Sequence, residues 1–89
     1  MYDFSNKRKH KQARKKAGNY ISRADVREQI FNRDGHRCLK CGSKEHLTLD
    51  HIVSVYLGGE NTIGNLQTLC RSCNSAKSPD RIIDYRAVK

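Results

Sequence analysis

Residues 38–77 read CLKCGSKEHLTLDHIVSVYLGGENTIGNLQTLCRSCNSAK, and two Cys-x-x-Cys pairs frame most of this stretch. The first pair is Cys38 and Cys41, and the second is Cys70 and Cys73. Four thiolates in two close pairs suit a closed tetrahedral zinc site, which leaves no coordination position for a substrate. The pattern therefore predicts a structural Zn2+ site, with a redox-active disulfide or an iron–sulfur cluster as the alternatives.

The spacer between the two pairs is unusually long. It holds 28 residues between Cys41 and Cys70, whereas the spacers of common zinc ribbons run to about 20 residues. A further structural unit must therefore be inserted between the pairs. Because the thiolates converge on the ion only in the folded chain, zinc affinity contributes to the free energy of folding, and the loss of one cysteine is expected to unfold much of the domain.

Length and composition allow one small domain at most. The chain has 89 residues, of which 36% are hydrophobic, and it contains no Trp. A unit of this size buries too little apolar surface to be stable without a further constraint, which the zinc site would provide. Apolar clusters begin after residue 21. We therefore expect a basic arm, flexible or helical on binding, over residues 1–20 and a single domain over residues 21–89.

The charge of the chain favours a polyanionic partner. Lys and Arg number 18 against 9 acidic residues, which gives a formal net charge of +9, and nucleic acid is the first candidate for such a partner. Residues 7–16 hold seven of these cations. Among them, Lys15 and Lys16 are expected to contact nucleic acid. A solvated tail and a membrane-surface arm are the alternatives, but the arm lacks the apolar face that membrane insertion needs.

Neither a membrane span nor a secretion signal is evident. No apolar run approaches the roughly 20 residues that a spanning helix needs, and the charged N-terminus is not followed by the hydrophobic core of a signal peptide. We therefore expect a cytoplasmic protein without a membrane partner. In a reducing compartment, paired cysteines are metal ligands more often than disulfides.

Helices are expected before and after the long spacer. Ser22 followed three residues later by Asp25 resembles a capped start, and this helix should end near residues 34–35. A second, short helix is expected over residues 70–78, where Pro79 would end it. The apolar residues of the segment 81–89 predict a short docked helix.

The spacer itself has the pattern of a hairpin. Residues 47–53 alternate between two faces and predict a strand, and the chain returns through residues 65–69. Gly58-Gly59 marks the loop between them. Gly42 suits the tight turn of a metal knuckle. The expected fold class is small α+β, a two-stranded antiparallel hairpin plus a helix, stabilised by the four-cysteine zinc site and preceded by a helix.

The hairpin and the last helix carry Asp50-His51, Asn65 and Asn74, and at these residues the chain resembles the HNH endonuclease family. The fold of that family is a two-stranded hairpin and a helix that together grip a metal ion. The resemblance covers about residues 30–78, and its combined motif is specific. Where the family ends its motif with histidine this chain has Asn74, so that its motif reads His-Asn-Asn.

The resemblance implies a role for each of these residues. His51 would take a proton from water, Asp50 and Asn74 would hold one divalent ion, and Asn65 would brace the loop and orient His51. Carboxylate and amide oxygens suit Mg2+ or Mn2+ better than softer ions. The implied reaction is hydrolysis of DNA phosphodiester bonds to a 5′ phosphate and a 3′ hydroxyl.

The remaining cations give less information. Arg71 and Lys77, on the last helix, are expected either to contact the phosphate backbone or to be solvated. With no base-reading module in the chain, sequence specificity should be weak unless a protein partner supplies it. The leading hypothesis is thus a metal-dependent DNA endonuclease, and the alternative is a noncatalytic, zinc-stabilised nucleic-acid-binding module. An assembly role, and settings from homing to phage packaging, stay open.

Overall fold

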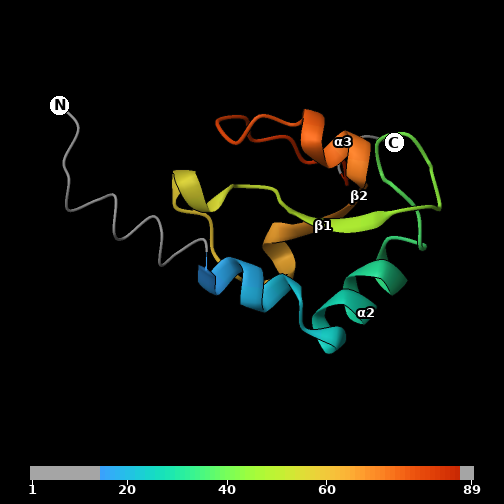
Figure 1. The fold of residues 1–89 in the computed structure, drawn as a ribbon, viewed down its shortest axis with the longest axis horizontal. Coiled ribbons are helices and arrows are strands. Elements are labelled where there is room, and N and C mark those ends of the chain that lie inside the picture. The colour runs from blue at the N-terminus through green and yellow to red at the C-terminus, as the bar shows by residue number, and fades with distance from the viewer. Residues whose placement is uncertain (1–14, 87–89) are drawn as a thin grey trace, which may run out of the picture.

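A computed structural model describes residues 15–86 of the chain, and the expectations for residues 1–14 and 87–89 lie outside this range. A helical segment, residues 15–21, precedes the helix α2 (Ala24–Arg33). The strands β1 (Leu47–His51) and β2 (Leu66–Cys70) follow, and the helix α3 (Arg71–Ala76) begins directly after β2 (Figure 1). Two 3-10 turns, Val55–Leu57 and Ile63–Asn65, lie between the strands. This is the small α+β fold that the sequence predicts.

The helix α2 ends as expected but begins differently. No side chain caps its N-terminus, and Ser22 instead donates its hydroxyl to the carbonyl of Asn19 at 3.0 Å. The predicted Ser22 cap is therefore wrong. At the other end the chain leaves the helix at Asp34, where Gly35 adopts a φ of 76° that favours glycine.

The two strands form an antiparallel hairpin whose register determines the rest of the site. Asp50 pairs with Gln67, and His51 pairs with Leu66. All five residues of β2 are buried. The second strand therefore lies inside the domain, and polar side chains on it require partners within the protein.

The apolar core has two parts. The first joins α2 to the hairpin through Val26, Ile30, Leu49 and Leu66. The second surrounds two cysteines, Cys38 and Cys70, with Leu69 buried beside them. Because a chain of this size buries little apolar surface, the cysteine cluster forms a substantial share of the core.

Both ends of the described chain pack against these clusters. In the segment 15–21, Ala17 is buried, and Tyr20 and Ile21 pack on the first cluster. In the C-terminal segment, Tyr85 packs on the second cluster. Residues 81–86 contain no helix, so the expected docked helix is wrong for this part of the tail. None of the helices in residues 15–86 is long and apolar enough to cross a membrane.

Candidate active site

The four cysteines gather as the sequence predicts. Their sulfur atoms all lie within 4.8 Å of one another, and Cys41 Sγ is 3.7 Å from Cys70 Sγ. A tetrahedral zinc ion with Zn–S bonds of about 2.3 Å would separate its sulfurs by about 3.8 Å. Gly42 turns the first knuckle with a φ of 81° and donates its N–H to the carbonyl of Cys38. The arrangement can hold a metal ion and fits zinc.

The environment of the cluster shifts the pKa values of two of its thiols in opposite directions. Burial acts to raise the pKa of Cys38, but backbone N–H groups of Cys41, Cys70 and Lys40 outweigh it and lower the pKa to about 6. Burial and the neighbouring thiols raise the pKa of Cys73 to about 12. A metal ion shared by the four sulfurs would favour the thiolate form of these residues, because cysteine binds metal as the thiolate.

A second site of different chemistry lies in a cavity of about 280 Å³ between the hairpin and α3. Asp50 and His51 of β1 and Asn74 of α3 all line it, as does Lys77 just after α3. Ile21, from the helical segment 15–21, forms part of the wall. The structure thus brings together three of the four side chains that are expected to act in catalysis or to bind the divalent ion, and the fourth, Asn65, does not line this cavity.

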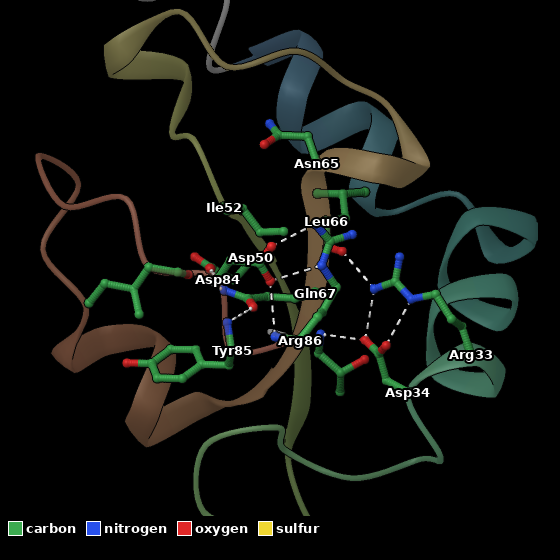
Figure 2. A network of polar contacts seen from close by, with 12 residues as sticks. Arg33, Asp34, Asp50, Ile52, Asn65, Leu66, Gln67, Asp84, Tyr85 and Arg86 are labelled. Atoms are coloured by element: carbon green, nitrogen blue, oxygen red, sulfur yellow. Dashed lines mark hydrogen bonds and ion pairs between the residues drawn. The ribbon is translucent and has the colours of Figure 1, made fainter. Parts of the chain in front are cut away.

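Asp50 is nearly enclosed. It is 8% exposed, and its Oδ2 accepts hydrogen bonds from Lys77 Nζ at 2.7 Å and from Gln67 Nε2 at 2.8 Å. Figure 2 shows Asp50 and Gln67 side by side within the wider polar network. Among the hydrogen bonds of residues 15–86, none reaches Oδ1. One carboxylate oxygen is therefore held by the protein, and the other is left for a ligand.

Lys77 is placed differently from the expected phosphate contact. Its side chain is 4% exposed, and the ammonium donates to Asp50 Oδ2 and to the carbonyls of His51 and Ile52 at 2.8 and 3.2 Å. An ammonium has three protons, and these three acceptors use them all. Lys77 in this fold is an internal cation of the site, because burial and pairing withdraw it from solvent.

His51 has a partner that the sequence does not reveal. Its Nε2 lies 3.0 Å from Asn61 Oδ1, in the loop between the strands. With the amide oxygen as acceptor, Nε2 carries the proton of the neutral ring, and Nδ1 keeps its lone pair. No local pattern around Asn61 indicates this contact, since it depends on the path of the loop.

Asn65 closes that loop. Its Nδ2 donates to the carbonyls of Val53 and Glu60 at 3.0 and 2.9 Å, and its Oδ1 accepts the N–H of Val53 at 2.9 Å. The backbone carbonyl of Asn65 accepts the N–H of Ile52. The side chain thus ties Val53, two residues after the end of β1, and Glu60 of the loop to the residue that precedes β2.

Asn74 is anchored through its nitrogen. Its Nδ2 donates to Thr48 Oγ1 at 2.8 Å, and the Thr48 hydroxyl donates in turn to the carbonyl of Leu69 at 2.8 Å. With the amide nitrogen held on the hairpin, the amide oxygen is the polar side-chain atom of Asn74 that has no hydrogen-bond partner among the described residues. Among the other predicted contacts, Arg71, Lys15 and Lys16 are exposed.

The site and its frame define a class of protein. Residues 38–80 match the family model described as HNH endonuclease, and this segment of the chain belongs to that family. The chain is also similar to the CRISPR-associated endonuclease Cas9 of Actinomyces naeslundii, with 42% identity over 64 residues. That alignment covers 66% of this chain but 6% of the relative, so the chain spans only a small part of the protein it matches. The comparison with solved structures gives no match.

Proposed function

We propose that the chain is a metal-dependent DNA endonuclease that hydrolyses phosphodiester bonds. The observation that carries the proposal is the meeting of Asp50, His51 and Asn74 in one cavity of a domain of the HNH endonuclease family. The similar segment of Cas9, whose name describes an endonuclease, supports the same class of reaction.

The donor atoms of the site favour a hard divalent ion. Asp50 Oδ1 and the amide oxygen of Asn74 are both oxygen ligands, and such ligands suit Mg2+ or Mn2+. When bound, the ion would supply charge neutralisation at the phosphate and help for the leaving 3′ oxygen. The chain's own contribution is to hold these two oxygens at the cavity and to keep the carboxylate oriented.

His51 would serve as the general base. A neutral imidazole whose Nε2 is held by Asn61 presents Nδ1 to a water molecule, and a base so placed can accept its proton as the water attacks phosphorus. Asn65 would support this step by fixing the backbone that follows His51, and we rank it as a positioning residue.

Binding of DNA would rest on charge. The formal net charge is +9, and the exposed Lys15 and Lys16 belong to the helical segment whose Ile21 reaches the cavity wall. Arg71, exposed at the start of α3, would add a phosphate contact near Asn74. Contacts of this kind position a duplex but carry no base information, so a protein partner would supply sequence specificity.

The test is nicking of a supercoiled plasmid by the zinc-loaded chain, with Mg2+ or Mn2+ and with a chelator of these ions. The variant His51→Ala should lose about 10²-fold or more of the rate, the share that a general base typically contributes. His36→Asn is the matched control, because His36 is exposed and lies outside the cavity. Undiminished nicking by His51→Ala would overturn the assignment of the base.

One observation favours the noncatalytic alternative. The Lys77 ammonium already neutralises Asp50, so the cavity is electrostatically satisfied without a divalent ion. A zinc-stabilised binding module would retain DNA in a salt-sensitive manner, since counterions are released on binding, but would cut no strand with any metal. Nicking that depends on Asp50 separates the two hypotheses.

A further inference from the structure

Gln67 is a fully buried amide at the second position of β2, directly opposite Asp50. Its side chain makes three hydrogen bonds, each of 2.8 Å: Nε2 donates to Asp50 Oδ2 and to the carbonyl of Ile83, and Oε1 accepts the N–H of Tyr85. Figure 2 shows the amide between the carboxylate and the C-terminal segment. Every proton of the amide is used, and its oxygen is used as well.

The orientation of this amide is fixed by its backbone partners. The N–H of Tyr85 can only donate, so the atom facing it is the amide oxygen. The carbonyl of Ile83 can only accept, so the atom facing it is the amide nitrogen. Both contacts give the same assignment, and that assignment directs a donor at Asp50. The C-terminal segment therefore determines what Gln67 offers to the carboxylate.

Packing alone does not account for an amide at this position. Leu66 and Leu69, on the same strand, are fully buried without polar atoms in their side chains. A buried amide destabilises the fold unless its hydrogen bonds are made. Unlike an apolar residue, Gln67 supplies an immobile hydrogen-bond donor to Asp50.

The second donor to Asp50 differs in kind. Lys77 reaches Oδ2 with an ammonium on a long flexible stem, whereas Gln67 sits within a paired strand and is held at both ends of its amide. An incoming divalent cation repels the ammonium but not the neutral amide. Gln67 is thus the contact that keeps Oδ2 in place, and Oδ1 free, as the positive charge around the carboxylate changes.

We infer that Gln67 is a positioning residue, which holds Asp50 in the orientation that binds the divalent cation and is itself oriented by residues 83–85. The inference rests on the proposed function, because it takes Asp50 as a ligand of that cation. It extends the site to a strand residue and a C-terminal segment that do not line the cavity.

The test is Mn2+ binding to the full, zinc-loaded chain, followed by electron paramagnetic resonance. Gln67→Met keeps the length and packing of the side chain but removes all three hydrogen bonds. Its dissociation constant for Mn2+ should rise about 10-fold or more, as is typical when a partner of a metal ligand is lost. Thr68→Val is the matched control, since Thr68 is the next residue of β2, is fully buried, and its hydroxyl has no partner among the described residues.

The outcomes separate this inference from the proposed function. Binding that Asp50→Asn abolishes, but that Gln67→Met leaves as tight as in the parent chain, would overturn the role of Gln67 alone. Absence of any Asp50-dependent Mn2+ binding in the parent chain would overturn both. A lower melting temperature of Gln67→Met with an unchanged dissociation constant also counts against the inference, because it marks a purely structural residue.

A measurement on the unaltered chain covers the case in which Gln67→Met fails to fold. In a Mg2+ titration followed by nuclear magnetic resonance, the side-chain amide signals of Gln67 should shift and saturate together with the carboxylate signal of Asp50. Gln29, exposed on α2, is the internal control and should not respond. Amide signals of Gln67 that stay fixed while the carboxylate of Asp50 responds would overturn the inference.

Discussion

Lys77 Nζ lies 2.7 Å from Asp50 Oδ2, and this ion pair joins the residue after α3 to the strand β1. The two side chains are 4% and 10% exposed. A buried pair as a whole contributes little to stability, because desolvation offsets the attraction, but the removal of one partner leaves an uncompensated charge. The pair therefore fastens α3 to the hairpin at the cavity.

Replacing Lys77 by Met tests this dependence. Without the ammonium, the buried carboxylate of Asp50 lacks its counter-charge, and the free energy of unfolding should fall by about 3–5 kcal/mol. Mn2+ should restore part of the loss by taking over the neutralisation of Asp50. Urea unfolding with and without Mn2+ measures both effects, with exposed Lys40→Met as the control. A Lys77→Met chain as stable as the parent without Mn2+ would contradict the argument.

Asp34 gives a prediction about pH. Burial acts to raise its pKa, but hydrogen bonds from the Arg33 guanidinium and from the backbone N–H of Thr68 outweigh burial and lower the pKa. Because the pKa of Asp34 is lower in the folded chain than the unfolded value of about 3.9, its carboxylate stabilises the fold above that pH. This stabilisation is lost as pH falls through the folded pKa. Asp34→Asn should therefore cost about 2 kcal/mol at pH 7.

The difference between Asp34→Asn and the parent chain should shrink as pH falls below about 4, and it should be lost once pH passes the lowered pKa of Asp34 in the folded parent. Paired thermal or urea unfolding at each pH measures this difference and cancels effects common to both chains, including protonation of the cysteine cluster. A difference that stays constant down to pH 2.5 would show that the charge of Asp34 is not the source of the stabilisation.

Asn61 should affect catalysis more than folding. Its contact with His51 Nε2 fixes the ring and its tautomer, and Asn61→Ala should slow nicking by about 10-fold, a part of what the general base supplies. Thr62→Ala, a change in the exposed neighbour, should nick at the parent rate. Equal nicking rates for both variants would show that Asn61 does not contribute to catalysis. A melting temperature close to that of the parent shows that the loss is not unfolding.

Gly59 is required by a close approach of the backbone. A Cβ atom at this position would lie 1.6 Å from the carbonyl oxygen of Val53. Gly59→Ala should therefore displace the segment to which Asn65 is bonded and cost about 1–3 kcal/mol, the range for overpacking. Gly64→Ala in the same loop meets no atom within 4 Å and is the control. Equal melting temperatures for the two variants would contradict this structure of the loop.

Removal of zinc should unfold the domain. The second core cluster contains Cys38 and Cys70, and structural zinc sites in small domains contribute roughly 10–16 kcal/mol of apparent binding free energy. A strong zinc chelator, or the variant Cys70→Ser, should abolish the helical circular dichroism signal, and added Zn2+ should restore it only in the chelated parent. Retention of the signal after measured loss of zinc would contradict a structural role.

The sequence was sufficient for the parts of the fold that rest on local pattern. Spacing predicts the cysteine cluster, and alternation predicts the first strand; the second strand follows from the return of the chain, and both agree with the structure to within two residues. The resemblance to a known family also identifies Asp50, His51 and Asn74, which line the cavity, and Asn65, which does not. In each case the side chain's neighbours follow from its place in a strand, a knuckle or a helix.

Other contacts depend on long-range geometry that no local pattern encodes. Lys77 has the position of an exposed helix cation, but α3 ends just before it and the chain directs its stem inward. The partnership of Asn61 with His51 depends on the path of an irregular loop. Gln67 is a partial exception to this dependence on long-range geometry. The register of the paired strands places it opposite Asp50, and two buried polar residues that face each other across a hairpin indicate a hydrogen bond.

The pairing of Leu47 with Cys70 has a consequence for the fidelity of the hairpin. A ladder of five residue pairs is short enough to slip, and a slip of one residue turns every side chain to the opposite face. Cys70 ends this ladder and belongs to the cysteine cluster, so a metal held there would pin the alignment three pairs away from Asp50 and Gln67. A chain that loses the metal would then risk misalignment as well as loosening, with its carboxylate turned away from the cavity.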